Sequence, residues 1–268
     1  MATTAIFGAG VMGETLLSGL LRSGRPADDI VITEKRGDHA ATLRERYGVR
    51  VLDNAQAAEV AEVLVLVVKP QDMDGLLGEI REHIAPGNLV VSLAAGIPTA
   101  YLESRLPEGS SVVRVMPNTP ALVDQGMAAI SPGRNCTADH LAEAEALLAS
   151  CGKVLQIAEK HQDAVTAISG SGPAYIFYVV ESMIEAGVLL GLPRATSTEL
   201  VVQTLYGAAT MLRETGEHPT VLRERVSSPG GTTMAAIRQL EDHKVRAAFM
   251  TAMEAAAARS AELAAGLT

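Results

Sequence analysis

Residues 3–13, TTAIFGAGVMG, decide the fold of this chain. The apolar run Thr3–Phe7 leads directly into GAGVMG (residues 8–13), a G-x-G-x-x-G pattern that opens a helical stretch extending to Ser23. Between a strand and a helix, Gly8 permits a tight turn, Gly10 lets a pyrophosphate approach the backbone, and Gly13 permits close packing of helix on strand. With the free N–H groups of a helix N-terminus added, the stretch predicts a dinucleotide-binding turn.

The first 160 residues continue this alternation of short β-branched runs with helical patterns. The run Val63–Val68 is apolar throughout, as expected of a central strand buried on both faces. Alternation with short connections predicts an α/β fold with a parallel, doubly wound sheet of the Rossmann type. The expected strands are Thr3–Phe7, Ile30–Thr33, Val49–Leu52, Val63–Val68, Leu89–Leu93, Val112–Val115, Met127–Ile130 and Val154–Ile157. Helical patterns between them include Val11–Ser23, Asp38–Tyr47 and Gln71–Ile84.

After about residue 160 the pattern becomes helical. Ala174–Leu190, Arg194–Glu214 and Lys244–Ala265 carry apolar residues at helical spacing, and prolines precede several of the expected helices. We therefore expect two domains, a dinucleotide-binding domain at residues 1–160 and an all-α domain at residues 161–268.

The helical domain is too short to bury all of its own apolar surface, because its helices have long faces of Ala, Met, Val and Leu. One interpretation is a two-domain monomer whose helices pack on each other and on the sheet. The other is a homodimer in which two helical domains pack together, since obligate interfaces resemble a core cut in half. We favour the homodimer.

Composition excludes several classes of protein. The net charge is −9, and eight aromatic residues with no Trp leave few rings for base stacking, so nucleic acid is not an expected partner. No apolar run approaches a membrane span, and the N-terminus lacks the basic region of a signal peptide. Two cysteines and no clustered His, Cys or carboxylate spacing argue against a metal site. A soluble, cytoplasmic protein is expected.

The end of the second expected strand leaves the choice of cofactor open. Glu34 lies 21 residues after Gly13, where an acidic residue commonly binds the free ribose 2′-hydroxyl of NAD. Lys35 and Arg36 follow at once and could pair with the 2′-phosphate of NADP, or be plain surface charges.

Further candidates follow other strands, at the edge where open α/β sheets bind ligands. Lys69 and Pro70 end the fourth strand, and Lys69 is either a ligand group or a solvated strand-end lysine. Ala94-Ala95-Gly96 leaves room for a flat ring after the fifth strand. Two prolines around Asn118 make a rigid loop after the sixth, which could also be a purely structural turn.

In the helical domain two segments have unusual composition. SGSGPAY (residues 169–175) and SSPGGTT (residues 227–233) both place small residues before a helix. Both are explained by the capping and close packing of helices, and the second, with two glycines and two threonines, could instead form a carboxylate site of N–H groups and hydroxyls. No lysine lies between His161 and His243, so a hydroxy-acid dehydrogenase with a lysine proton carrier in this domain fits poorly. His39, His83 and His140 lie in polar helical stretches and are expected at a solvated surface.

Taken together, these motifs resemble pyrroline-5-carboxylate reductase. GAGVMG, VKPQ, RVMPNTPA, ISGSGPAY and VSSPGGTTMAAI occur in the order and at the spacing of that family, over essentially the whole chain. VSSPGGTTMAAI is the most specific of them, because it is not a general Rossmann feature.

The resemblance implies an activity and a set of residues. The family reduces 1-pyrroline-5-carboxylate to L-proline with NAD(P)H, in the last step of proline biosynthesis, by hydride transfer to an imine carbon. Thr233 would be the hydroxyl near the ring nitrogen, while Ser228, Gly230, Gly231 and Thr232 would hold the substrate carboxylate. The residues implied for the cofactor are Gly8, Gly10, Val11, Met12, Gly13, Glu34, Lys35, Arg36, Asn54, Lys69, Pro70, Ala94, Ala95, Gly96 and Asn118.

The resemblance also implies self-association. Members form interlocked dimers, often assembled further as pentamers of dimers. Many members place Ser or Arg after the second strand, and Glu34-Lys35-Arg36 departs from that pattern. We expect NADPH, with NADH as the alternative, because two basic residues outweigh one acid if Glu34 turns aside. Competing hypotheses are a 3-hydroxyacid dehydrogenase and a non-catalytic NAD(P)-binding regulator.

Overall fold

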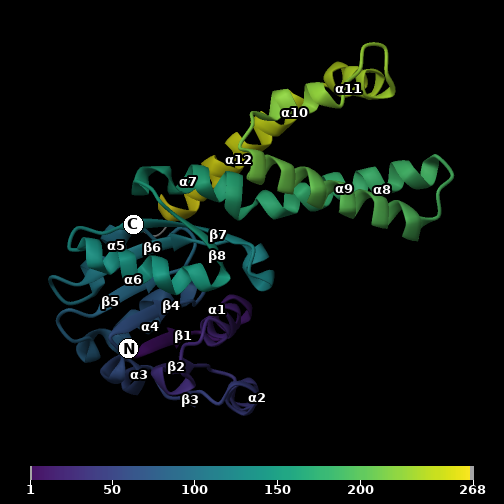
Figure 1. The fold of residues 1–268 in the computed structure, drawn as a ribbon. Helices are drawn as coiled ribbons and strands as arrows, with labels where there is room; N and C mark the ends of the chain where they lie inside the picture. Colours follow the sequence, from purple (N-terminus) through teal and green to yellow (C-terminus); the bar gives the residue numbers. More distant parts are fainter. Residues whose placement is uncertain (1, 266–268) are drawn as a thin grey trace. The chain divides into compact units, whose positions relative to one another are not determined.

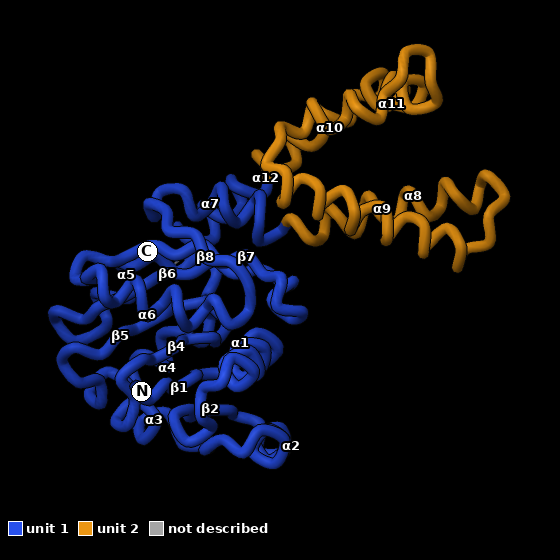
Figure 2. The backbone as a smooth tube through the Cα atoms, in the orientation of Figure 1, with its two compact units in different colours: residues 1–171, 256–268 blue, residues 172–255 orange. Residues whose placement is uncertain are grey.

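The computed structural model describes residues 2–265, shown in Figure 1. The chain divides into two compact units, coloured separately in Figure 2. The first comprises residues 1–171 and 256–268, and the second comprises residues 172–255. None of the helices within residues 2–265 combines the length and apolarity that crossing a membrane requires.

The first unit contains a single sheet of eight strands, in the order β3-β2-β1-β4-β5-β6-β7-β8 (Figure 1). All eight expected strands are present, and the run starting at Val63 is a central strand, between β1 and β5, as predicted. The strands are β1 (Thr4–Phe7), β2 (Ile30–Thr33), β3 (Arg50–Val51), β4 (Val63–Leu66), β5 (Leu89–Ser92), β6 (Ser111–Met116), β7 (Gly126–Pro132) and β8 (Gly152–Gln156).

The sheet is parallel from β3 through β6, but β7 runs antiparallel to β6 and β8 is parallel to β7. The expectation of a wholly parallel sheet is therefore wrong for the last two strands. The connection from Met116 to Gly126 contains only a short 3₁₀ turn, Thr119–Val123. It is shorter than the crossover of a dozen or more residues that parallel neighbours require, so the chain turns back.

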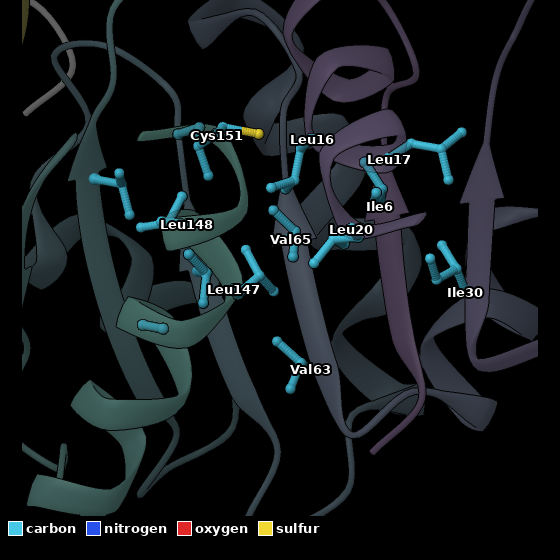
Figure 3. Packing of buried hydrophobic residues seen from close by; sticks show 14 of the residues in the cluster. Ile6, Leu16, Leu17, Leu20, Ile30, Val63, Val65, Leu147, Leu148 and Cys151 are labelled. Atoms are coloured by element: carbon cyan, nitrogen blue, oxygen red, sulfur yellow. The ribbon is translucent and has the colours of Figure 1, made fainter. Parts of the chain in front are cut away.

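Helices cover both faces of the sheet, and alternate strand residues serve the two layers. Ile6 and Val65 pack with α1 (Val11–Arg22) and α6 (Ala138–Leu148) in one core, part of which Figure 3 shows. Phe7 and Leu66 point to the opposite face and pack with α4 (Met73–Ile80). The other helices of this unit are α2 (Gly37–Tyr47), α3 (Asn54–Val60), α5 (Thr99–Arg105) and α7 (Gln162–Val165), followed by a π-helical turn at Thr166–Gly170.

The second unit is helical, as predicted, and buries little of its own apolar surface. The long α8 (Gly172–Leu189) and α9 (Arg194–Thr215) pack as an antiparallel pair, where Ser197 lies against Gly187 and donates to the Ile184 carbonyl at 2.9 Å. Only Ser197 and Val201 are buried among residues 172–255. The remaining helices are α10 (Pro219–Arg225), α11 (Thr232–Asp242) and α12 (Val245–Ala265), the last of which continues into the first unit.

Candidate functional site

A cleft of about 800 Å³ opens at the carboxyl ends of β1, β2, β3 and β4. It lies where the strand order reverses, with β1 between β2 and β4, and open α/β sheets bind ligands at such switch points. Six of the predicted cofactor residues line this cleft: Gly8, Glu34, Lys35, Arg36, Asn54 and Lys69.

The glycine turn at the cleft is closely packed on one side and open on the other. Gly8 adopts φ +96°, and an added Cβ would lie 3.1 Å from the Val67 carbonyl oxygen. An added Cβ at Gly13 would overlap the Gly8 carbonyl oxygen. At Gly10 an added Cβ would meet nothing within 4 Å. Gly8 and Gly13 thus serve the turn itself, whereas Gly10 leaves space for a ligand, and the turn fits a dinucleotide.

The N-terminus of α1 supplies donors beside this open position. Gly10 is its N-cap, and no side chain caps the helix. The Gly10 carbonyl accepts from the Glu14 amide at 2.8 Å, so the preceding amides of Val11, Met12 and Gly13 have no intrahelical acceptor. Such amides and the helix dipole favour an anion such as a pyrophosphate.

His39 contacts the glycine turn, and the sequence analysis did not select it as a site residue. It is half-buried in α2, and its Nε2 lies 3.0 Å from the carbonyl oxygen of Ala9. A carbonyl only accepts, so Nε2 carries the proton and donates. His39 is thus only partly exposed, whereas a solvated surface position was expected. Its position in a polar helical stretch contained no signal of a contact 30 residues away in the chain.

Glu34, the acidic residue after β2, accepts hydrogen bonds from Arg36. Glu34 Oε1 accepts from the Arg36 backbone amide at 3.0 Å and from Arg36 Nε at 3.3 Å. Burial by itself would raise the pKa of the Glu34 carboxyl, but these hydrogen bonds and the charges of Arg36 and His39 hold the pKa below its ordinary value. Glu34 is therefore an ionised acceptor already bound to Arg36.

Other polar residues of the cleft also have protein partners. Asn54 Nδ2 donates to Glu79 Oε2 at 2.6 Å, and Lys35 Nζ lies 3.8 Å from Asp72 Oδ1. Lys69 is exposed and caps the 3₁₀ turn Pro70–Asp72 through its backbone. The exposed ammonium of Lys69 leaves it available to an anionic ligand.

The segments that follow β5 and β6 are a tight turn and a loop that is tethered by Asn118. Gly96 adopts φ +76°, which suits the tight turn of Ala94-Ala95-Gly96. Asn118 uses its whole amide within the protein, accepting from the Met127 amide at 2.8 Å and donating to the Ser169 carbonyl at 3.2 Å. Met12 and Asn118 also line an apolar cavity of about 20 Å³. The side chain of Asn118 therefore ties its loop to β7 and to the π-helical turn.

An ion pair between a buried arginine and a half-buried glutamate supports the same edge. Arg114 on β6 is 7% exposed and donates from Nη1 to Glu159 Oε1 at 3.2 Å. Glu159 also accepts from the Thr99 backbone amide at 2.7 Å and the Thr99 hydroxyl at 2.6 Å, and so caps the start of α5. Glu159 was not a sequence candidate, because only the fold brings it beside residues 45 and 60 positions away.

The predicted substrate residues form one compact turn in the second unit. The Gly231 amide donates to the Ser228 carbonyl at 3.0 Å, and Gly230 between them adopts φ +70°. Gly231 is the N-cap of α11, and no side chain caps this helix. Thr232 and Thr233 are its first residues, and Thr233 is half-buried. Backbone amides and two threonine hydroxyls thus surround one helix start, which suits a carboxylate.

Two family models match the chain. The first, described as pyrroline-5-carboxylate reductase dimerisation, covers residues 159–263. The second, described as NADP oxidoreductase coenzyme F420-dependent, covers residues 3–96, which include the glycine turn and Ala94–Gly96.

The chain is also similar over nearly its whole length to several pyrroline-5-carboxylate reductases. It is 48% identical to a pyrroline-5-carboxylate reductase from Corynebacterium melassecola, over 98% of this chain and 99% of the relative. It resembles the solved structure of a pyrroline-5-carboxylate reductase from Coxiella burnetii, with a TM-score of 0.93, 36% identity and 98% of each chain covered. An NADP-bound pyrroline carboxylate reductase from Plasmodium falciparum superposes with a TM-score of 0.88 at 29% identity, again over 98% of each chain.

Proposed function

This chain belongs to the pyrroline-5-carboxylate reductase family, and on that premise we propose which of its residues carry out the reduction of 1-pyrroline-5-carboxylate to L-proline. The protein is an NAD(P)H-dependent oxidoreductase acting on a C=N bond, in the last step of proline biosynthesis. The observation that carries the function is this similarity over 98% of the chain, together with a glycine turn whose Gly8 lines a ligand-sized cleft and whose Gly10 is open.

The cofactor is NADPH, with NADH as a second substrate, and the residues of the sheet edge hold it. We assign the pyrophosphate to Gly8, Gly10, Val11, Met12 and Gly13, where α1 offers free amides. The adenosine side of the cofactor lies in the part of the cleft that Glu34, Lys35, Arg36 and Asn54 line. Lys69, Pro70, Ala94, Ala95, Gly96 and Asn118 border the nicotinamide. When bound, the reduced nicotinamide supplies the hydride that the imine carbon accepts.

The substrate carboxylate belongs to Ser228, Gly230, Gly231 and Thr232. Gly230 in its left-handed conformation makes the turn that brings the Ser228 hydroxyl beside Gly231, and the start of α11 adds backbone donors. An added Cβ at Gly231 would lie 2.5 Å from Ser228 Oγ, so glycine here leaves room for the serine hydroxyl. A carboxylate bound here fixes the orientation of the small ring.

Thr233 is the catalytic hydroxyl. The reduction adds a hydride to the imine carbon and a proton to the ring nitrogen, so the C=N double bond becomes a single bond. An imine protonated to an iminium is already electrophilic, and the protein needs no strong acid. The Thr233 hydroxyl holds the proton at the ring nitrogen while the carboxylate turn keeps the ring in place. No Lys or His is needed from the helices between His161 and His243.

The protein acts as a homodimer. The match of residues 159–263 to a dimerisation domain supports self-association, and so does the near absence of buried residues in the second unit. Multi-angle light scattering at micromolar concentration separates a monomer, a dimer and a decamer by mass. A monomer would reject the shared helical core, and a mass of ten chains would extend the dimer to a pentamer of dimers.

Residues 1–160 and 161–268 are the functional domains in this proposal, the first binding NAD(P)H and the second binding substrate and the partner chain. The site of action is the cytoplasm, which supplies NADPH to biosynthetic reductions. Expression of the chain with a C-terminal fluorescent protein tests this location.

The decisive experiment measures the oxidation of NADPH and NADH side by side with 1-pyrroline-5-carboxylate as the electron acceptor. Turnover with formation of proline is the expected result. Activity with a 3-hydroxy acid but none with the imine would instead favour a hydroxyacid dehydrogenase, and cofactor binding without any turnover would favour a regulator.

A further inference from the structure

Glu34 stands where Rossmann proteins commonly place the acceptor of the ribose hydroxyls, yet one oxygen of its carboxylate is already engaged by Arg36. Its side chain is only 9% exposed, and Oε1 receives both the backbone amide and Nε of Arg36. A ribose needs an acceptor with free lone pairs, and here Oε1 already accepts two hydrogen bonds, so that only Oε2 is left for a ligand.

Arg36, in contrast, remains open to a ligand. Its side chain is 64% exposed, and only its Nε is engaged by Glu34. No partner of the two terminal nitrogens lies among residues 2–265. A guanidinium fixed through Nε presents its terminal N–H groups in one orientation, which suits the oxygens of a phosphate.

We propose that Glu34 is a positioning residue for Arg36 and does not bind the ribose, and that the Arg36 guanidinium held in this way recognises the 2′-phosphate of NADPH. The inference rests on the proposed function, since it assigns the adenosine end of the same cleft. It reverses the usual effect of an acid at this position, because Glu34 then promotes the binding of the phosphorylated cofactor.

The two roles of Glu34 predict opposite results for one variant. If Glu34 bound the ribose, Glu34→Ala would weaken the binding of NADH and relieve repulsion of the 2′-phosphate, so that NADPH would bind more tightly. If Glu34 positions Arg36, the same variant frees the guanidinium, and the affinity for NADPH falls while the affinity for NADH changes little. Glu34→Gln keeps an oxygen for the Arg36 donors and is expected to retain more of the NADPH affinity than Glu34→Ala.

The experiment titrates the dimeric protein with NADPH, NADH and 2′,5′-ADP by isothermal calorimetry, without the imine substrate. Glu34→Ala and Arg36→Ala are each expected to raise the Kd of NADPH and 2′,5′-ADP about tenfold, and the Kd of NADH less than threefold. In the double variant, loss of Glu34 should add nothing to the loss of Arg36. Arg44→Ala is the matched control, because Arg44 is an exposed arginine of α2 outside the cleft lining.

Four results would overturn the inference: tighter NADPH binding by Glu34→Ala, a tenfold loss of NADH affinity in that variant, unchanged affinities in that variant, or additive effects in the double variant. Circular dichroism of each variant verifies that the fold is kept. Failure of the wild-type protein to reduce the imine would reject the proposed function separately, since the titrations do not depend on turnover.

Discussion

The imidazole of His39 donates from Nε2 to the carbonyl oxygen of Ala9 at 3.0 Å, which joins α2 to the middle of the glycine turn. Ala9 is fully buried, so this hydrogen bond fixes the backbone immediately before Gly10. The amides that follow at the start of α1 are those assigned to the pyrophosphate.

Loss of this donor should therefore loosen the cofactor site without unfolding the protein. His39→Leu is expected to raise the Kd of NADPH about fivefold, since one hydrogen bond is worth about 1 kcal/mol. His39→Gln, which can still donate an N–H, should restore most of the affinity. The matched control is His83→Leu, because His83 pairs with Glu59 outside the cleft. Equal affinities in His39→Leu and the wild type would show that the turn does not need the imidazole.

Two glycines of one motif should respond differently to the same change. Gly10→Ala meets nothing within 4 Å, so the Tm should stay within about 2 °C of the wild type while the Kd of NADPH rises at least tenfold. Gly13→Ala would overlap the Gly8 carbonyl and should lower the Tm by several degrees. Calorimetric melting and titration of both variants check this. A large loss of Tm in Gly10→Ala would contradict the open side of the turn.

Removal of the Thr233 hydroxyl should affect the chemical step. Thr233→Ala is expected to lower kcat/KM for the imine about 100-fold, the lower range for a positioned proton-holding group, while the Kd of NADPH stays near that of the wild type. Thr233→Ser keeps a hydroxyl at the same helix position and should recover much of the rate. Steady-state kinetics with wild-type values in Thr233→Ala would remove this residue from the mechanism.

The ion pair between Arg114 on β6 and Glu159 should contribute to stability. Glu159→Ala leaves the buried Arg114 guanidinium unpaired and removes the cap of α5, and we expect the free energy of unfolding to fall by about 2 kcal/mol. Urea denaturation of the protein measures this difference. Glu82→Ala serves as the control, because the Glu82 side chain is 87% exposed and should change stability by less than about 0.5 kcal/mol.

Dimerisation should couple stability to protein concentration. Because residues 172–255 bury only Ser197 and Val201 by themselves, folding of this unit is expected to depend on a second chain. The Tm should then rise as the concentration of the protein increases. Differential scanning calorimetry over a 100-fold range of concentration tests the coupling, and a constant Tm across that range would argue against it.

The strands and long helices were predictable because their physical signals are local. Val63–Leu66 is apolar at every position since both faces of β4 are buried, and Arg194–Thr215 follows a proline at its N-cap. The reversal at β7 was not anticipated, because apolar runs do not encode strand direction. The length of the connection from Met116 to Gly126 was the available signal, because so short a connection indicates an antiparallel β7.

The residues of the site that belong to local motifs were predictable from the sequence, and the contacts between distant residues were not. The positions of Gly8, Glu34, Arg36 and Asn54 around one cleft follow from their places after successive strands. The direction of the Glu34 carboxylate does not, because it depends on the conformation of two following residues. His39 escaped prediction for a similar reason, since a lone histidine in a polar helix looks the same whether or not a buried carbonyl lies within its reach.

The interlocking of Gly8 with Gly13 has a consequence for how the protein meets its cofactor. The Gly8 carbonyl occupies the space that any side chain at Gly13 would need, and the Gly8 amide donates to Thr33 on the neighbouring strand at 3.1 Å. The turn is thus held in place by the protein's own packing and hydrogen bonding. NADPH is therefore expected to bind to a turn that is already ordered. Its binding then does not include the entropic cost of ordering this loop.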